Sequence, residues 1–167
     1  MKRKRPARCE DLLSQTAAHF PEINTPALRL ISRLFRLREV IFENAQREMA
    51  RFELSAAEFS VLSTLRKAPT PFERRPSEIY KGMLLTSGGL TKILKALEAR
   101  GLIERVGDEA DRRSSRVRLT SVGVEIAEAA MKAVIASDTA MLNRVADSAA
   151  LDAIAESLRP FTEVLDR

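Results

Sequence analysis

The segment LTKILKALEARGLIERVGDEADRRSSRVRLT, residues 90–120, decides the fold of this chain. Its first part carries leucine or isoleucine at positions 90, 93, 94 and 97, which share one face of an α-helix. Gly101 follows, where a glycine in the left-handed conformation commonly ends a helix. Leu102–Val106 and Arg116–Leu119 flank the polar turn 107–115, a pattern typical of two paired strands. The segment therefore predicts a helix followed by a β-hairpin.

Two further helices are predicted immediately before this segment. Ser55 has Glu58 three residues after it, which is the pattern of a capping box at a helix start. A short helix is predicted from about Pro76 to Met83, and the next one begins at Thr86 or Ser87. Three consecutive helices and a hairpin are the layout of a winged helix-turn-helix. In that layout the third helix keeps a free polar face, and a helix fits the major groove of B-DNA.

Long helices are predicted on both sides of the winged region. Apolar residues recur at three- and four-residue steps over Ala27–Phe52, which predicts an amphipathic helix of about seven turns. Thr120 is placed to cap an alanine-rich helix running to about Val145, and a last helix spans about Ala149–Leu165. The first helix is too long to use all of its apolar surface in one small core. Part of it is therefore expected to face a second chain.

Composition excludes several classes of protein. The 167 residues include one Cys and one His, which excludes a disulfide framework within the chain and argues against metal sites and a Ser-His-Asp triad. No apolar run is long enough to cross a membrane. The basic N-terminus lacks the apolar stretch of a secretory signal. We expect a soluble, cytoplasmic protein that is not an enzyme, has no catalytic residues and holds no cofactor or metal.

The formal net charge of +5 is unevenly distributed. Five basic residues lie among the first eight, so the rest of the chain is neutral overall. Residues 76–120 hold nine basic and six acidic residues, whereas residues 121–167 hold four basic and eight acidic ones. A basic middle segment between acidic ends suits the binding of an anionic partner to one face of the protein. The alternative is that the charged residues are simply scattered over a solvated surface. The basic N-terminal arm either follows DNA or is simply solvated.

Three segments together resemble the MarR family of transcription regulators: LSAAEFSVL (54–62), LTKILKALEARGLIER (90–105) and DRRSSRVRLT (111–120). The resemblance covers about residues 27–145. It implies a mainly α fold, a winged helix-turn-helix with long N- and C-terminal dimerisation helices, in a homodimer. Regulators of this family typically bind pseudo-palindromic operators and release them when a small, often phenolic or acidic, ligand binds.

The expected organisation has four parts. Residues 1–26 form a basic, flexible arm, in which Leu12–Phe20 is compatible with a short helix. Residues 27–53 form a dimerisation helix, residues 54–120 the DNA-binding winged domain, and residues 121–167 the C-terminal dimerisation helices.

The expected DNA-binding residues lie on the third helix of the winged domain and on the hairpin. They are Ser87, Gly88, Thr91, Lys92, Lys95, Asp111, Arg112, Arg113 and Arg116. Lys92 and Lys95 lie opposite the leucine stripe, and the other three helix residues lie near the helix start, where backbone N–H groups favour a phosphate. The resemblance implies that Arg113 enters the minor groove and that Asp111 orients the wing. The alternatives are solvated lysines and a local salt bridge in the turn.

The sequence thus predicts a sequence-specific DNA-binding regulator, expected to act as a dimeric repressor. Its expected partners are double-stranded DNA, a second copy of itself and a small effector, with no membrane. The effector pocket is expected between the long helix and the winged domain, lined by Arg36, Phe59, Leu62 and Leu90. Two alternatives stay open. One is a winged protein-interaction module without DNA binding, and the other is a redox sensor in which cations near Cys9 lower the pKa of its thiol.

Overall fold

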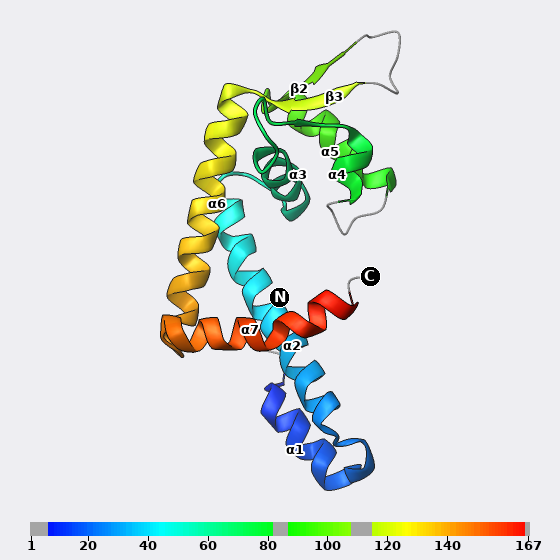
Figure 1. Cartoon of the computed structure of the whole chain (residues 1–167), viewed down its shortest axis with the longest axis vertical. Helices are drawn as coiled ribbons and strands as arrows, with labels where there is room; N and C mark the ends of the chain where they lie inside the picture. Colours follow the sequence, from blue (N-terminus) through cyan, green and yellow to red (C-terminus); the bar gives the residue numbers. More distant parts are fainter. Residues whose placement is uncertain (1–6, 82–86, 108–114, 166–167) are drawn as a thin grey trace, which may run out of the picture. The chain divides into compact units, whose positions relative to one another are not determined.

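The computed structural model describes residues 7–81, 87–107 and 115–165 (Figure 1). The chain forms two compact units, Met1–Asn44 and Ala45–Arg167, and each is described by itself. The predicted mainly helical fold with a winged helix-turn-helix is confirmed. None of the helices in the described ranges has both the length and the apolar character that a membrane span requires.

The first unit is a helical hairpin. It contains α1 (Cys9–His19), a 3₁₀ turn (Pro21–Ile23) and the first part of α2 (Pro26–Ala50). Two carboxylates in the first turn of α1 suit the positive end of its dipole. The Arg33 guanidinium of α2 donates from Nε and Nη2 to the two Glu10 carboxylate oxygens, at 3.0 Å each. This bidentate pair ties the two helices together.

Within the segment 1–26, expected to be an arm compatible with a short helix, the described residues 7–26 contain α1 and the 3₁₀ turn. The helix begins at Cys9 rather than at Leu12, and Leu13 is buried with 8% of its surface exposed. The two compact units meet after Asn44, inside the long helix, and the expected division of the chain into four parts stays a prediction. The Glu10–Arg33 pair joins residues 23 positions apart, and local periodicity carries no signal for such a contact.

The winged part of the second unit contains α3 (Ala56–Arg66), α4 (Pro76–Lys81) and α5 (Ser87–Ala99), followed by β2 (Ile103–Val106) and β3 (Arg116–Leu119). These helices lie beside the hairpin of the two strands (Figure 1). A further strand, β1 (Glu73–Arg74), was not predicted. It pairs antiparallel with β3 and gives the sheet order β1-β3-β2. Two charged residues have no apolar alternation that would reveal a strand.

The core of this unit lies between α3, α5, the sheet and the first half of α6 (Ser121–Leu142). The predicted leucine stripe of α5 is buried at Leu90, Leu94 and Leu97, with Ile93 partly buried. Val117 and Leu119 point to the same buried face of β3, as the alternating pattern predicted. The segregation of apolar and polar residues thus fixes which side of α5 is free.

Local signals place the helix ends. Ser55 and Glu58 form the predicted capping box, with the Ser55 backbone N–H donating to the Glu58 carboxylate at 2.8 Å. Gly101 has a φ of 67°, the left-handed conformation expected after α5. Thr120 caps α6, since its Oγ1 accepts a hydrogen bond from the Gly123 N–H at 3.0 Å. The last helix, α7 (Ser148–Leu165), follows α6 after a short turn.

Two charged contacts support the packing of α3. Burial raises the pKa of the Glu58 carboxyl, but hydrogen bonds from Ser55 and the nearby Arg100 guanidinium outweigh this effect and hold that pKa below its usual value. Arg66 pairs with Glu128 of α6 at 2.6 Å, and this hydrogen-bonded pair lowers the pKa of Glu128. The Arg66 guanidinium also lies 4.5 Å from the centre of the Phe72 ring, in reach of a cation–π interaction.

Candidate nucleic-acid interface

The free face of α5 carries the residues that the helical pattern placed there. Thr91, Lys92 and Lys95 are all exposed, opposite the buried leucine stripe. Ser87 is the first residue of α5 and Gly88 the second, so their backbone amides belong to the first helical turn. The first four N–H groups of a helix have no partner within it and are available to an anion. The structure therefore brings these five positions to one helix, three of them on a solvent-exposed face.

The two lysines of α5, Lys92 and Lys95, carry positive charge on the exposed face of the helix. Neither Lys92 nor Lys95 forms an ion pair with a residue in the described ranges, whereas the acidic residues beside them are paired. Glu98 lies 3.4 Å from Arg105, and Glu104 lies 3.7 Å from Arg118. Lys92 and Lys95 therefore present exposed positive charge on α5, as an electrostatic contact to a phosphate backbone requires.

The wing is described up to its turn. Asp111, Arg112 and Arg113, which the sequence pattern predicts to contact DNA, lie outside the described residues. The strands on either side are paired from Ile103↔Leu119 to Val106↔Arg116. The last pair stands directly before and after the turn, so the sheet fixes both of its ends.

Arg116, the remaining candidate on the wing, belongs to a network of charges across the sheet. Its guanidinium lies 3.5 Å from Glu73, and its side chain is 45% exposed. Arg118 donates from Nε and Nη2 to a single Glu73 oxygen, at 3.0 and 2.8 Å. Glu73 therefore holds β1 to β3 and partly neutralises Arg116. Sequence reasoning missed Glu73 and Arg118, because their contact joins residues 45 positions apart.

A groove of about 1220 Å³ lies between α4, α5 and the hairpin. Thr91 and Lys95 line it from the helix, Arg105 lines it from β2, and Tyr80 lines it from α4. The groove thus continues from the exposed face of α5 towards the wing. The exposed face of α5 protrudes beside the concave groove. This shape suits an elongated polyanion better than a compact substrate.

The residues expected to line an effector pocket are not brought together in one cavity. Arg36 belongs to the first unit, where it lines a cavity and pairs with Glu39 at 2.9 Å. Leu62 is fully buried in the core of the second unit, and Phe59 packs against that core. Leu90 is 6% exposed and lines the groove beside α5. Within the described ranges, His, Cys, Asp and Glu form no cluster that could hold a metal ion.

Comparisons with known proteins agree on one family. The model of the MarR family matches residues 52–114. The HTH-type transcriptional regulator PecS of Dickeya dadantii (strain 3937) is 31% identical over 113 residues, which are 68% of this chain and 68% of PecS.

Solved structures show the same fold. AbsC, a MarR family transcriptional regulator from Streptomyces coelicolor, superposes with a TM-score of 0.70 at 19% identity, over 85% of this chain and 96% of AbsC. The transcriptional repressor CouR, bound to a 23-mer DNA duplex, superposes with a TM-score of 0.67 at 29% identity, over 80% of this chain and 92% of CouR. These relatives and neighbours are regulators by name, and none of these names describes an enzyme.

Proposed function

Because the chain belongs to the MarR family of transcriptional regulators, we propose that it binds double-stranded DNA with α5 in the major groove. The observation that carries this proposal is the asymmetry of α5. The leucines of one face are buried in the core. The opposite face exposes Thr91, Lys92 and Lys95 to solvent. A helix held in this way can enter a groove without losing its own packing.

In this proposal the two lysines approach phosphates or guanine edges, and the first turn of α5 faces a phosphate. Asp111, Arg112 and Arg113 belong to the wing, with Arg113 entering the minor groove. Arg116 contributes less to DNA binding in this proposal, because its guanidinium also pairs with the Glu73 carboxylate at 3.5 Å. CouR, the repressor solved with DNA, supports the same use of the winged region by analogy.

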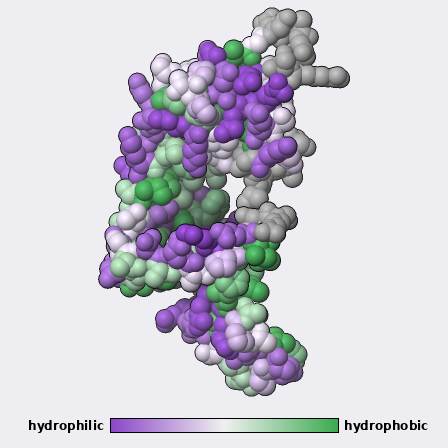
Figure 2. Space-filling model, viewed as in Figure 1, coloured by the Kyte–Doolittle hydropathy of each residue, from purple (hydrophilic) through white to green (hydrophobic). Residues whose placement is uncertain are grey.

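The functional form in this proposal is a homodimer, which would read a pseudo-palindromic operator with half-sites about one helical turn apart. The support is apolar surface outside the winged part. Large apolar side chains of α2 and α7 are exposed, and no described residue of α7 is buried (Figure 2). The most exposed are Phe35 at 67%, Val164 at 63% and Leu165 at 77%. Surfaces of this kind on a stable protein commonly mark an interface between chains.

The regulatory part of the proposal is repression that a small ligand relieves. The protein would occupy its operator in the cytoplasm until a phenolic or acidic effector binds. This part rests on the resemblance to the family and on the name of CouR, which is a repressor.

The experiment that tests DNA binding starts from duplexes selected from genomic fragments by the full-length protein. The affinity for a selected duplex is then measured over a range of salt concentrations. We expect the logarithm of the affinity to fall linearly with the logarithm of salt concentration, by about 0.9 for each neutralised phosphate. Failure to enrich any sequence would favour a winged protein-interaction module instead.

A further inference from the structure

Arg100, the residue directly after α5, is anchored to the turn that follows another helix. Its Nη1 donates to the Glu53 carbonyl at 2.9 Å, and its Nη2 donates to the Phe52 carbonyl at 3.4 Å. Both carbonyls belong to the turn after α2, within the second unit. Nη1 also donates to a carboxylate oxygen of Glu58, on α3, at 3.3 Å. One guanidinium therefore joins the end of α5 to α3 and to the end of α2.

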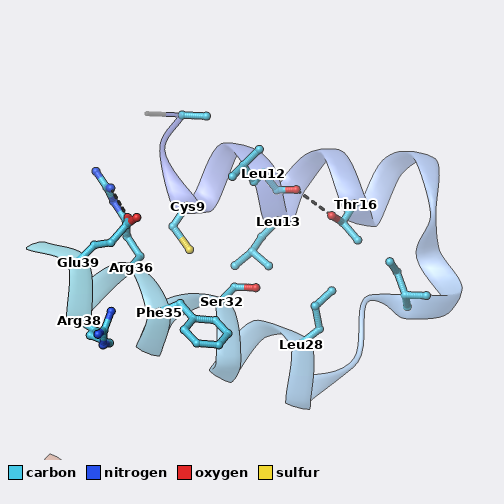
Figure 3. A pocket seen from close by; sticks show the side chains of 12 residues that line it. Cys9, Leu12, Leu13, Thr16, Leu28, Ser32, Phe35, Arg36, Arg38 and Glu39 are labelled. Atoms are coloured by element: carbon cyan, nitrogen blue, oxygen red, sulfur yellow. Dashed lines mark hydrogen bonds and ion pairs between the residues drawn. The ribbon is translucent and has the colours of Figure 1, made fainter. Parts of the chain in front are cut away.

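These contacts differ from those of an ordinary surface ion pair. The Arg36–Glu39 pair, at 2.9 Å, joins two residues of α2 that are three positions apart (Figure 3). The contacts of Arg100 reach residues 42 to 48 positions away. The Arg100 side chain is 31% exposed and that of Glu58 is 15% exposed. Long-range contacts between partly buried side chains fix the relative position of elements, whereas a local surface pair contributes little.

The partners of Arg100 are themselves held in place. The second carboxylate oxygen of Glu58 accepts from the Ser55 N–H at 2.8 Å, in the capping box of α3. Leu54, directly after Glu53, is buried, and its N–H donates to the Met49 carbonyl of α2 at 3.1 Å. The turn after α2 therefore offers its carbonyls to Arg100 from a fixed place.

The leucine stripe of α5 cannot supply the same restraint. Apolar packing fixes which side of the helix faces the core, but it has no preferred direction. A guanidinium is planar and its donors have a fixed geometry, so hydrogen bonds to two carbonyls restrict rotation and sliding of the helix end. Lys92 and Lys95 lie on the same helix within eight residues of Arg100. Their orientation towards DNA therefore depends on this anchor.

We infer that Arg100 is a positioning residue for DNA binding, which holds α5 in the orientation that base contacts require without touching DNA itself. This inference deepens the proposed function and rests on it. A helix end that is already fixed does not have to be ordered on binding. Phosphate contacts carry no sequence information, whereas contacts to base edges specify the sequence. Arg100 therefore affects binding to the selected sequence and not binding to DNA in general.

The test compares the native protein with Arg100→Gln on the selected duplex and on a scrambled duplex of the same composition. We expect Arg100→Gln to bind the selected duplex about tenfold more weakly, as the loss of a hydrogen-bonded charged contact suggests. Its affinity for the scrambled duplex should be unchanged. The salt slope should also be unchanged, because the same phosphates are neutralised. Arg51→Gln breaks an exposed pair with Glu48 in the same region, and should alter neither affinity.

A loss of folded protein gives a different result from a loss of position. Stoichiometric titration with the scrambled duplex measures the active fraction of each variant. Partial unfolding lowers this fraction but leaves the ratio of the two affinities as in the native protein. Arg100→Lys keeps a positive charge beside Glu58 but lacks the planar fork, so we expect an intermediate ratio. This variant carries the comparison if Arg100→Gln does not fold.

Amide hydrogen exchange without DNA tests the anchor independently of the proposed function. The N–H groups of Leu54 and Gly101 should exchange faster in Arg100→Gln, whereas those of β3 should exchange as in the native protein. Unchanged exchange at Leu54 and Gly101 would overturn the anchor, whether or not the protein binds DNA. If exchange responds but the native protein prefers no duplex, the proposed function fails while the anchor stands.

Three results of the binding comparison would overturn the positioning role. A salt slope shallower by about 0.9 in Arg100→Gln would show that Arg100 itself neutralises a phosphate. Equal weakening on the selected and scrambled duplexes would show a general loss of binding. Native affinity for both duplexes would show that the orientation of α5 does not depend on Arg100.

Discussion

Gly123 of α6 lies so close to Leu102 that a Cβ atom on residue 123 would stand 1.8 Å from the Leu102 carbonyl oxygen. The same carbonyl accepts a hydrogen bond from the Thr120 N–H at 3.2 Å. The Thr120 hydroxyl donates to the Gly101 carbonyl at 2.7 Å. The start of α6 is therefore docked onto the connection between α5 and β2, which joins the long helix to the end of the proposed recognition helix.

Gly123→Ala is expected to destabilise the protein by about 1–3 kcal/mol, since the backbone must move to admit a methyl group. Urea unfolding measures this loss. Gly89→Ala in α5 is the matched control, because a Cβ there would meet nothing within 4 Å. Replacing an unconstrained helical glycine should raise stability by about 0.5–1 kcal/mol. Equal effects of the two substitutions would contradict the close approach.

The capping box of α3 should make stability depend on pH in the acid range. The pKa of Glu58 in the folded protein is below the ordinary value of a glutamate carboxyl. A lowered pKa means that the ionised carboxylate stabilises the fold above the pKa of the unfolded chain, and this contribution is lost as pH falls through the folded pKa. Glu58→Gln should therefore be less stable than the native protein at pH 7, and the difference should shrink as the pH falls below the ordinary glutamate range.

Ser55→Ala tests the other half of the capping box. Loss of the hydroxyl cap should cost about 0.5–2 kcal/mol at pH 7. A Glu58→Gln difference that is as large in acid as at neutral pH would show that the carboxylate charge has no part in the cap.

Glu73 is expected to be the residue that keeps β1 on the sheet. Glu73→Gln weakens the contacts to Arg118 and Arg116, and should lower the free energy of unfolding by about 1–2 kcal/mol. Amide hydrogen exchange of β1 should become faster. Glu156→Gln breaks an exposed pair with Arg159 on α7 and should cost less than about 0.5 kcal/mol. The account of β1 fails if both variants exchange like the native protein.

The proposed dimer should depend on the apolar surface of α7. Phe161 is 52% exposed, and Phe161→Asp should shift the protein from dimer to monomer in light scattering, because a carboxylate cannot be buried unpaired. Val122→Asp introduces the same charge at a similarly exposed position at the start of α6, and should remain dimeric. A native protein that is monomeric at micromolar concentration would contradict this part of the proposal.

Features encoded in short stretches of sequence could be predicted. The leucine stripe of α5, the cap at Ser55, the cap at Thr120 and the left-handed Gly101 each depend on residues within one or two helical turns. Because the stripe was identified, the positions of Lys92 and Lys95 on the free face followed directly.

Features that join distant residues could not be predicted. β1 depends on Glu73 meeting Arg118, and the hairpin of the first unit depends on Glu10 meeting Arg33. Leu62 was expected to line a pocket, yet it is fully buried. An apolar residue on a buried face has the same pattern whether it fills the core or borders a cavity, so only the packed structure distinguishes the two.

The proposed contact of α5 with DNA depends on Lys92 and Lys95, the two lysines of its free face. The affinity for a selected duplex is compared, over a range of salt concentrations, between the native protein and a Lys92→Gln/Lys95→Gln variant. Lys132→Gln on α6 serves as the control, since it removes an exposed lysine away from α5. The account predicts weaker binding in the double variant alone, with a salt slope shallower by about 0.9 for each phosphate that the lysines no longer neutralise. An affinity and a slope equal to those of the native protein would contradict it.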